Sequence, residues 1–185
     1  MRIIAGSLKG RRLRPPRWAG LRPTSDRLRE TLFNVLGDRV VAASVLDACA
    51  GTGALGFEAL SRGARAAAFV EQDRRAAALI AEHAARFGVA GRCRIVRGPL
   101  PQVVDDGRLA DTYDVILLDP PYDNPEIGAI LSAAGGRLAG GGVLVLERAR
   151  RADRPAAAGL AWSREIVSGD SVLDFYARLP GGGRD

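Results

Sequence analysis

Two periods of apolar spacing alternate along the chain and mark the expected elements. Short, nearly continuous apolar runs are typical of buried strands, and they occur at Ser44–Cys49, Ala67–Glu71, Arg92–Arg97, Tyr113–Leu118 and Gly142–Glu147. Helical spacing fills the intervals at Ala54–Arg62, Arg74–Phe87 and Pro125–Arg137. Trp162–Ser168 and Val172–Leu179 flank Gly169 and Asp170 as a closing hairpin. The alternation predicts an α/β fold, a mostly parallel sheet with helices on both faces.

A separate pattern precedes the first of these strands. Arg2–Ala5 and Arg11–Arg14 are predicted to form a short β-hairpin across glycines 6 and 10, which Pro15 and Pro16 end. A helix is then expected, with a cap among Thr24, Ser25 and Asp26, because Leu28, Leu32, Val35 and Leu36 share one face. Gly37 is placed to end this helix.

The composition limits the class of protein. The chain has 185 residues, 47% hydrophobic and 26% charged, which is typical of one globular domain. Cys49 and Cys93 have no CxxC spacing, so neither a disulfide framework nor a metal site is expected. No apolar run approaches the ~18 residues that cross a bilayer. We therefore expect a soluble, cytoplasmic protein with no membrane partner, acting as a monomer.

The positive charge is concentrated at the amino end. Of 27 basic and 21 acidic residues, 10 basic and 3 acidic residues lie within residues 1–39. A concentrated basic segment suits a phosphate backbone, although a solvated arm without a partner remains the alternative. We expect a basic extension at 1–39, a main domain at 40–180 and a flexible tail at 181–185.

A glycine motif lies between the first predicted strand and its helix. Gly51, Gly53 and Gly56 satisfy GxGxxG, and Glu71 follows at the end of the next strand, where it could accept ribose hydroxyls. This pattern suits a dinucleotide, S-adenosylmethionine or merely a structural turn. Asp47 favours S-adenosylmethionine, because a carboxylate attracts its cationic amino acid end and repels a pyrophosphate.

A second motif, Asp119-Pro120-Pro121-Tyr122, directly follows the apolar strand Tyr113–Leu118. A proline turn that ends the strand is the simpler interpretation. However, parallel sheets bind ligands beyond the carboxyl ends of their strands, and this motif lies at such an end. Its combination with the glycine motif and Glu71 indicates a catalytic site.

The second motif resembles that of S-adenosylmethionine-dependent methyltransferases that act on exocyclic or amide nitrogens. The chain is also similar to a narrower family, the bacterial 16S ribosomal RNA guanine-N2 methyltransferases. The similarity runs to about Glu147, and three stretches carry it, Arg2–Gly6, Leu21–Asn34 and Ala50–Gly63. One departure is visible, because related enzymes often have Asn or Asp after the third strand, where this chain has Val96–Leu100.

The resemblance implies a Rossmann-like class I methyltransferase fold with seven strands. It implies that S-adenosylmethionine donates a methyl group to the N2 amino group of one guanine in 16S rRNA, within the 30S subunit or an assembly intermediate. Backbone groups near Gly98 and Leu100 are expected to meet the adenine. The full set of expected cofactor-binding residues is Asp47, Ala50, Gly51, Thr52, Gly53, Glu71, Gly98, Leu100 and Asp119.

The catalytic residues expected are Asp119, Pro120 and Tyr122. Asp119 and the Pro120 carbonyl would accept the two N–H groups and localise the nitrogen lone pair, while Tyr122 would stack on the base. His83 is expected at the surface or in packing, without a catalytic role. The residues expected to contact RNA are Lys9, Arg11, Arg12, Arg14, Arg22, Thr24, Arg27 and Arg29.

Three other functions remain open from the sequence. A methyltransferase of DNA adenine or protein glutamine could use the same tetrapeptide, but the chain has no room for a large target-recognition domain. If the protein bound RNA without catalysis, the occurrence of Asp119 and Pro120 together with a cofactor loop would be unexplained. A nicotinamide dehydrogenase would explain the glycines and Glu71, and not the second motif.

Overall fold

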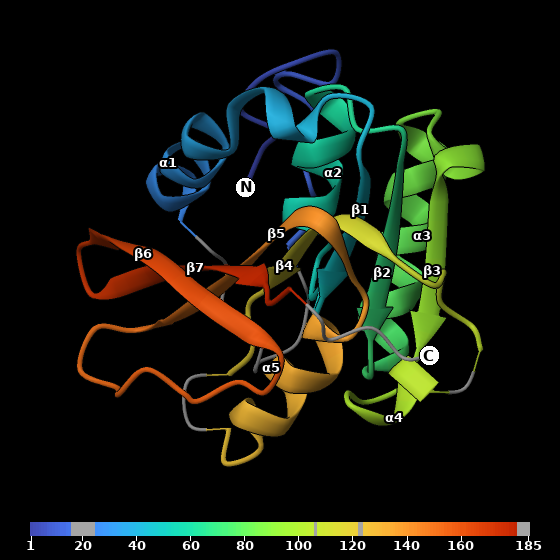
Figure 1. The fold of residues 1–185 in the computed structure, drawn as a ribbon. Helices are drawn as coiled ribbons and strands as arrows, with labels where there is room; N and C mark the ends of the chain where they lie inside the picture. Colours follow the sequence, from blue (N-terminus) through green and yellow to red (C-terminus); the bar gives the residue numbers. More distant parts are fainter. Residues whose placement is uncertain (16–24, 106, 122–123, 181–185) are drawn as a thin grey trace.

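The computed structural model describes residues 1–15, 25–105, 107–121 and 124–180. Their strands form one seven-stranded sheet in the order β3-β2-β1-β4-β5-β7-β6 (Figure 1). β1 to β5 run parallel, whereas β7 is antiparallel to both β5 and β6. The strands are β1 Ser44–Ala48, β2 Ala66–Glu71, β3 Cys93–Arg97, β4 Tyr113–Leu118, β5 Leu138–Ala149, β6 Leu160–Ser168 and β7 Ser171–Arg178.

The helices connect the parallel strands in the way that the alternating pattern predicts. They are α1 Asp26–Leu36, α2 Ala54–Ser61, α3 Arg74–Arg86, α4 Gln102–Asp105 and α5 Ile127–Gly135, with 3₁₀ turns η1 Gly37–Val40 and η2 Ala90–Arg92. Ser25 caps α1 by accepting a hydrogen bond from the Leu28 amide at 3.1 Å. Gly37 ends α1 with φ 52°, a conformation that glycine adopts at little cost.

The two faces of the sheet bury separate apolar clusters. Odd-numbered positions of β4 and β5, such as Leu117 and Val145, pack with α1, α2, α3 and the N-terminal residues. Even-numbered positions, such as Leu118 and Leu146, pack with α4 and α5. The predicted α/β fold with helices on both faces is therefore confirmed. No helix among the described residues is long and apolar enough to cross a membrane.

The structure corrects several predicted boundaries. The hairpin at 2–14 has one bridge, between Arg2 and Arg12, in place of two strands. β5 begins four residues earlier than predicted because Leu138 already pairs with Tyr113 of β4, ahead of a register shift, and α5 begins two residues later. The short α4 has no apolar period long enough to be seen in the sequence. The predicted tail at 181–185 lies outside the described residues.

The N-terminal arm, which we define as residues 1–15, is fastened to α2 by buried polar groups. Glu58 on α2 is 0% exposed and accepts hydrogen bonds from the amides of Ile4 and Ala5 at 2.8 and 3.1 Å. The Ser61 hydroxyl accepts from the Leu8 amide at 2.9 Å. A buried carboxylate without such donors would be costly, so these bonds fix the arm to the helix.

The prediction that Arg29 contacts RNA is wrong. Its side chain is fully buried, and its guanidinium donates to the carbonyl of Arg2 at 2.8 Å and to Asp26 at 2.7 Å. A second nitrogen of Arg29 lies 3.8 Å from the buried Glu58 carboxylate. Arg29 therefore serves as the internal counter-charge between α1, α2 and the arm, and it is not available to a phosphate.

Candidate active site

Carboxylates gather on one face of the sheet where its central strands end. Register pairs Leu117 of β4 with both Asp47 of β1 and Val145 of β5. Side chains two residues apart on a strand share a face, so Asp119 and Glu147 project from the same face as Asp47. In β2, Phe69 pairs with Asp47, which gives Glu71 this face too. It is the face that α1, α2, α3 and the arm cover.

A tight loop, residues 49–53, leads from β1 into α2 between these carboxylates. Gly51 and Gly53 have φ values of 55° and 77°, and Cys49 has φ 64°, which is unusual for a residue with a side chain. A Cβ on Gly53 would lie 2.8 Å from the Phe57 ring. The loop is therefore built for close backbone approach at a helix N-terminus, and we call it the glycine loop.

The carboxylates of Glu71 and Asp47 hold the glycine loop in place. Glu71 accepts from the Gly51 amide at 2.7 Å with one oxygen and from the Asp73 amide at 2.8 Å with the other. Asp47 accepts from the Gly56 amide at 2.8 Å. Each carboxylate oxygen has two lone pairs, so Glu71 keeps the capacity to accept ribose hydroxyls as well.

The charges of this site repel one another. Burial raises the pKa of Asp47 well above its usual value, and the neighbouring Asp119 and Glu71 raise it further. The same causes raise the pKa of the Cys49 thiol to about 12. Such a site favours a cationic ligand, which relieves the repulsion. S-adenosylmethionine, with its sulfonium and ammonium groups, fits these donors and acceptors.

The residues expected to bind the cofactor mostly gather around the glycine loop. Ala50 and Thr52 are each 8% exposed within the loop. Gly98 follows β3, has φ 154°, and donates its amide to the Glu71 carbonyl at 3.1 Å. Leu100 is buried in the cluster that packs with α4 and α5, on the opposite face of the sheet from Asp47 and Glu71. Among the described residues, no hydrogen bond joins Leu100 to the glycine loop.

The second motif lies where the sequence predicts it. The Asp119 amide approaches the Ala48 carbonyl at 3.5 Å, which keeps the motif against the end of β1. Asp119 is half-buried and Pro120 is buried. Tyr122, the expected stacking residue, lies outside the described residues. Among the described residues, no group of three His, Cys, Asp or Glu side chains could hold a metal.

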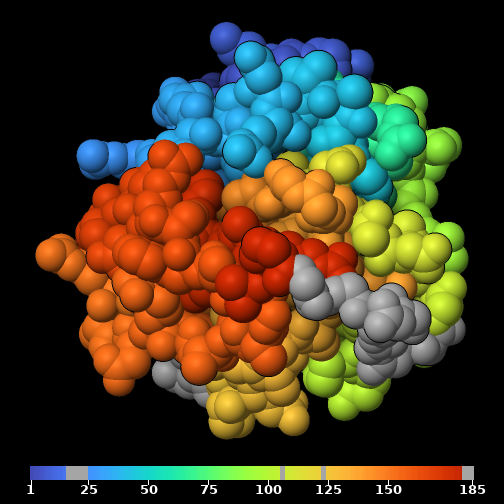
Figure 2. Space-filling model, viewed as in Figure 1, coloured from blue at the N-terminus to red at the C-terminus, as the bar shows by residue number. Residues whose placement is uncertain are grey.

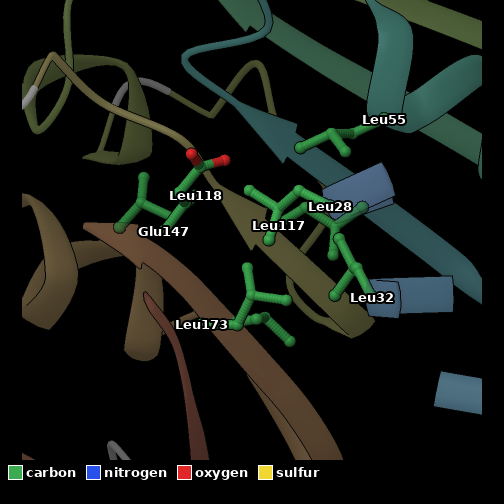
Figure 3. A pocket seen from close by; sticks show the side chains of 8 residues that line it. Leu28, Leu32, Leu55, Leu117, Leu118, Glu147 and Leu173 are labelled. Carbon is green, nitrogen blue, oxygen red and sulfur yellow. The ribbon is translucent and has the colours of Figure 1, made fainter. Parts of the chain in front are cut away.

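An apolar hollow lies between α1 and the sheet, near the carboxyl end of β4. Leucines from α1, α2, β4 and β7 line it, and the Glu147 carboxylate lies at one end of the group (Figure 3). Glu147 is 7% exposed and accepts a hydrogen bond from the Ser171 hydroxyl at 3.2 Å. The sequence gives no signal for this residue, because a single acid at the end of an apolar strand has many explanations.

His83, for which the sequence indicates only a surface or packing position, joins the arm to the glycine loop. Its Nε2 accepts from the Arg14 amide at 3.0 Å, and its Nδ1 lies 3.4 Å from the Thr52 carbonyl. The ring stacks on Phe87 and meets Phe57 edge-on. This network requires the neutral ring with its proton on Nδ1.

The basic side chains of the arm face solvent. Lys9, Arg11, Arg12 and Arg14 are exposed, as is Arg27 on α1. Arg14 forms one exposed ion pair with Glu82 at 3.4 Å. The arm and α1 cover one end of the molecule, adjacent to the residues of β6 and β7 (Figure 2). Arg22 and Thr24, also expected to contact RNA, lie outside the described residues.

Comparison with known proteins identifies the fold class and the family of the chain. The strand order and the helices on both faces define the Rossmann-like fold of class I S-adenosylmethionine-dependent methyltransferases. Residues 1–177 match the family described as conserved hypothetical protein 95, and the chain belongs to this family. Its similarity to ribosomal RNA small subunit methyltransferases D confirms the resemblance read from the sequence.

Three relatives illustrate the similarity. Ribosomal RNA small subunit methyltransferase D of Escherichia coli K12 is 41% identical over 122 residues, 66% of this chain and 60% of the relative. The matched part of the chain thus spans less than two thirds of that protein. YlbH of Bacillus subtilis, named provisionally as an rRNA methyltransferase, is 32% identical over 96% of this chain and 99% of its own. The structure of yhhF from Escherichia coli, described provisionally as a methyltransferase, has a TM-score of 0.84 and 34% identity, covering 96% of this chain and 97% of its own.

The buried histidine makes the stability of the protein depend on pH. Burial lowers the pKa of His83 to about 4, whereas an unfolded histidine titrates near about 6.5. Between these values the unfolded chain binds a proton that the native protein does not bind. The stabilisation is therefore complete above pH ~6.5, and we expect the free energy of unfolding to fall by about 2–3 kcal/mol as the pH drops toward ~4.

Urea denaturation of the wild type and His83→Gln between these pH values measures this effect. Glutamine can donate to Thr52 and accept from Arg14 without titrating, so the variant should lose this part of the pH dependence. The same pH dependence in both proteins would contradict the assignment to His83.

Proposed function

We propose that the protein transfers a methyl group from S-adenosylmethionine to the exocyclic N2 amino group of a specific guanine in 16S rRNA. The observation that carries the proposal is the position of Asp119 and Pro120 beside the glycine loop and Glu71. Family membership adds support, since one relative is a ribosomal RNA small subunit methyltransferase and the others are named as an rRNA methyltransferase and a methyltransferase. The substrate is the rRNA within the 30S subunit or an assembly intermediate, and the protein acts as a cytoplasmic monomer.

The cofactor-binding half consists of the glycine loop with Asp47 and Glu71. When bound, S-adenosylmethionine supplies an electrophilic methyl group on a positively charged sulfur. Glu71 accepts the ribose hydroxyls, and the negative cluster of Asp47 and Asp119 attracts the cationic groups. Ala50, Thr52 and Gly53 supply the backbone of the cradle, while backbone groups near Gly98 and Leu100 contact the adenine.

The catalytic half acts on the guanine amino group, whose lone pair is delocalised into the ring. Asp119 accepts one N–H, and the Pro120 carbonyl accepts the other because the proline pair fixes its direction. The two acceptors favour a tetrahedral nitrogen with a localised lone pair, which is catalysis by positioning and electrostatics. Asp119 also receives the proton after transfer, and Tyr122 stacks on the extruded base.

The extension at 1–39 binds the rRNA backbone. Its exposed cations, Lys9, Arg11, Arg12, Arg14 and Arg27, face solvent on the same side of the sheet as the catalytic carboxylates. Arg22 and Thr24 complete the proposed contact surface. Neutralising phosphates releases counterions, so this surface supplies affinity, and the pocket around Asp119 supplies the choice of base.

Glu71→Ala is expected to weaken the binding of S-adenosylmethionine by about tenfold or more, because a charged acceptor is lost. Calorimetric titration measures the dissociation constant, with the exposed Glu82→Ala on α3 as the matched control. Since Glu71 also holds the amides of Gly51 and Asp73, we expect a lower melting temperature in the variant. Binding of NADH in place of S-adenosylmethionine by the wild type would contradict the cofactor assignment.

The reaction itself is tested with labelled S-adenosylmethionine and two substrates, naked unmethylated 16S rRNA and unmethylated 30S particles. The wild type should label one guanine at N2. Asp119→Ala should bind the cofactor with at most a modest change and lose about 10²-fold or more of the methyl transfer, an effect of the size seen when one preorganised contact to a transition state is removed. Variant activity within a few fold of wild type would contradict the role of Asp119, and label at another atom would contradict the proposed substrate.

Replacing Arg11, Arg12 and Arg14 together by alanine should reduce the salt dependence of RNA binding. Each lost phosphate contact changes the slope of log K against log salt by about 0.7 for single strands. Filter binding across a salt series measures the slope, and calorimetry should show unchanged cofactor affinity. The matched triple variant replaces Arg65, Arg92 and Arg94, exposed arginines outside the arm that lie before β2, in η2 and in β3. Equal slopes for both variants and wild type would mean that the arm does not touch RNA.

A further inference from the structure

Glu147 is a buried carboxylate that the proposed transfer reaction leaves without a role. It follows Leu146, whose partner in the parallel pairing of β5 with β4 is Leu118, the residue before Asp119. Glu147 and Asp119 thus each come one residue after the last pair of these two strands. Both residues project from the face that carries Asp47, and neighbouring strands lie about 4.8 Å apart. Along the edge where the parallel strands end, Glu147 is therefore the next carboxylate after Asp119, on the side away from the glycine loop.

One side of Glu147 faces leucine side chains. Leu28, Leu117 and Leu173 line the hollow beside it (Figure 3), and the hollow holds about 10 Å³, enough for roughly one water molecule. A nucleobase does not fit inside this volume. A base held at Asp119 would instead present one edge to Glu147, where the low local polarity strengthens a hydrogen bond to a charged acceptor.

Ser171 orients this carboxylate. The hydroxyl of Ser171, at the start of β7, donates to Oε1 of Glu147 at 3.2 Å. In the sheet order β7 is the second strand from β4. A carboxylate oxygen accepts more than one hydrogen bond, so the group retains acceptor capacity toward a ligand. The bond between β5 and β7 restricts the torsions of the Glu147 side chain.

The Watson–Crick edge of guanine carries two neighbouring donors, the N1–H and the 2-amino group. The ends of β5 and β4 offer two neighbouring acceptors, Glu147 and Asp119. We propose that Glu147 accepts the N1–H of the target guanine while Asp119 and Pro120 hold its 2-amino group. This assigns Glu147 as the residue that specifies guanine, and it rests on the proposed function. Adenine presents an N1 lone pair at the same point, which a carboxylate repels, so the contact selects against adenine.

The test compares two RNA fragments that differ at the target base, guanine or 2-aminopurine. Both bases carry the 2-amino group that receives the methyl, whereas N1 of 2-aminopurine is an acceptor. Methyl transfer from labelled S-adenosylmethionine gives kcat/KM on each fragment for the wild type, Glu147→Gln and the control Glu30→Gln. Glu30 is an exposed glutamate of α1.

The wild type should prefer guanine, and Glu147→Gln should reduce that preference by about tenfold or more, the effect of one hydrogen bond to a charged group. The amide of glutamine can donate to N1 of 2-aminopurine, so part of the change should be a gain on that fragment. Glu30→Gln should keep the wild-type ratio. A structural effect of Glu147→Gln would lower both rates equally, and an unchanged ratio would overturn the inference.

Two further measurements separate the possible failures. Calorimetry with S-adenosylmethionine and a urea melt establish that Glu147→Gln is folded and binds the cofactor. If the wild type methylates the guanine fragment and the ratio is unchanged in the variant, only the role of Glu147 is wrong. If the wild type methylates neither fragment nor intact 30S particles at guanine, the proposed function itself fails.

Discussion

The register of four parallel strands forces acidic side chains together at one edge of the sheet. β2, β1, β4 and β5 are paired so that Glu71, Asp47, Asp119 and Glu147 share a face near their carboxyl ends. A one-residue slip in any pair would move its carboxylate to the other face. Burial and, after it, the neighbouring Asp119 and Glu71 raise the pKa of Asp47. A cationic ligand with donor groups is the natural complement of such an edge.

A second set of buried charges holds the arm. Glu58 accepts from the arm backbone and from Arg62, with Arg29 as its further counter-charge, so α1, α2 and the arm meet at one carboxylate. His83 extends this connection to the Thr52 carbonyl in the glycine loop. The arm is therefore packed against the same helices that position the loop. A surface that binds RNA on this arm would be held at a fixed distance from the cofactor site.

The local pattern of the sequence predicts most of the fold, because each strand and helix of the α/β unit has its own apolar period. β4 is predicted to the residue, and the cap at Ser25 and the stop at Gly37 follow from local chemistry. Arg29 shows where local reasoning fails. In the sequence it is one more cation in a basic segment, and only the position of Glu58, 29 residues further on, makes burial favourable. The bridging role of His83 is invisible for the same reason, since its partners Arg14 and Thr52 are distant in sequence.

The order of the strands divides the site between two tasks. The chain reverses direction across the sheet between β1 and β4, and this switch point is where open α/β sheets bind their ligands. The β1 and β2 ends carry the glycine loop and Glu71, while the β4 and β5 ends carry Asp119 and Glu147. Asp119 lies at this boundary. On one side it contributes to the raised pKa of Asp47, and on the other it follows Leu118, whose partner Leu146 precedes Glu147. A methyl donor and an acceptor base bound on either side of this boundary would meet at Asp119, so under the proposed function one carboxylate would serve both halves.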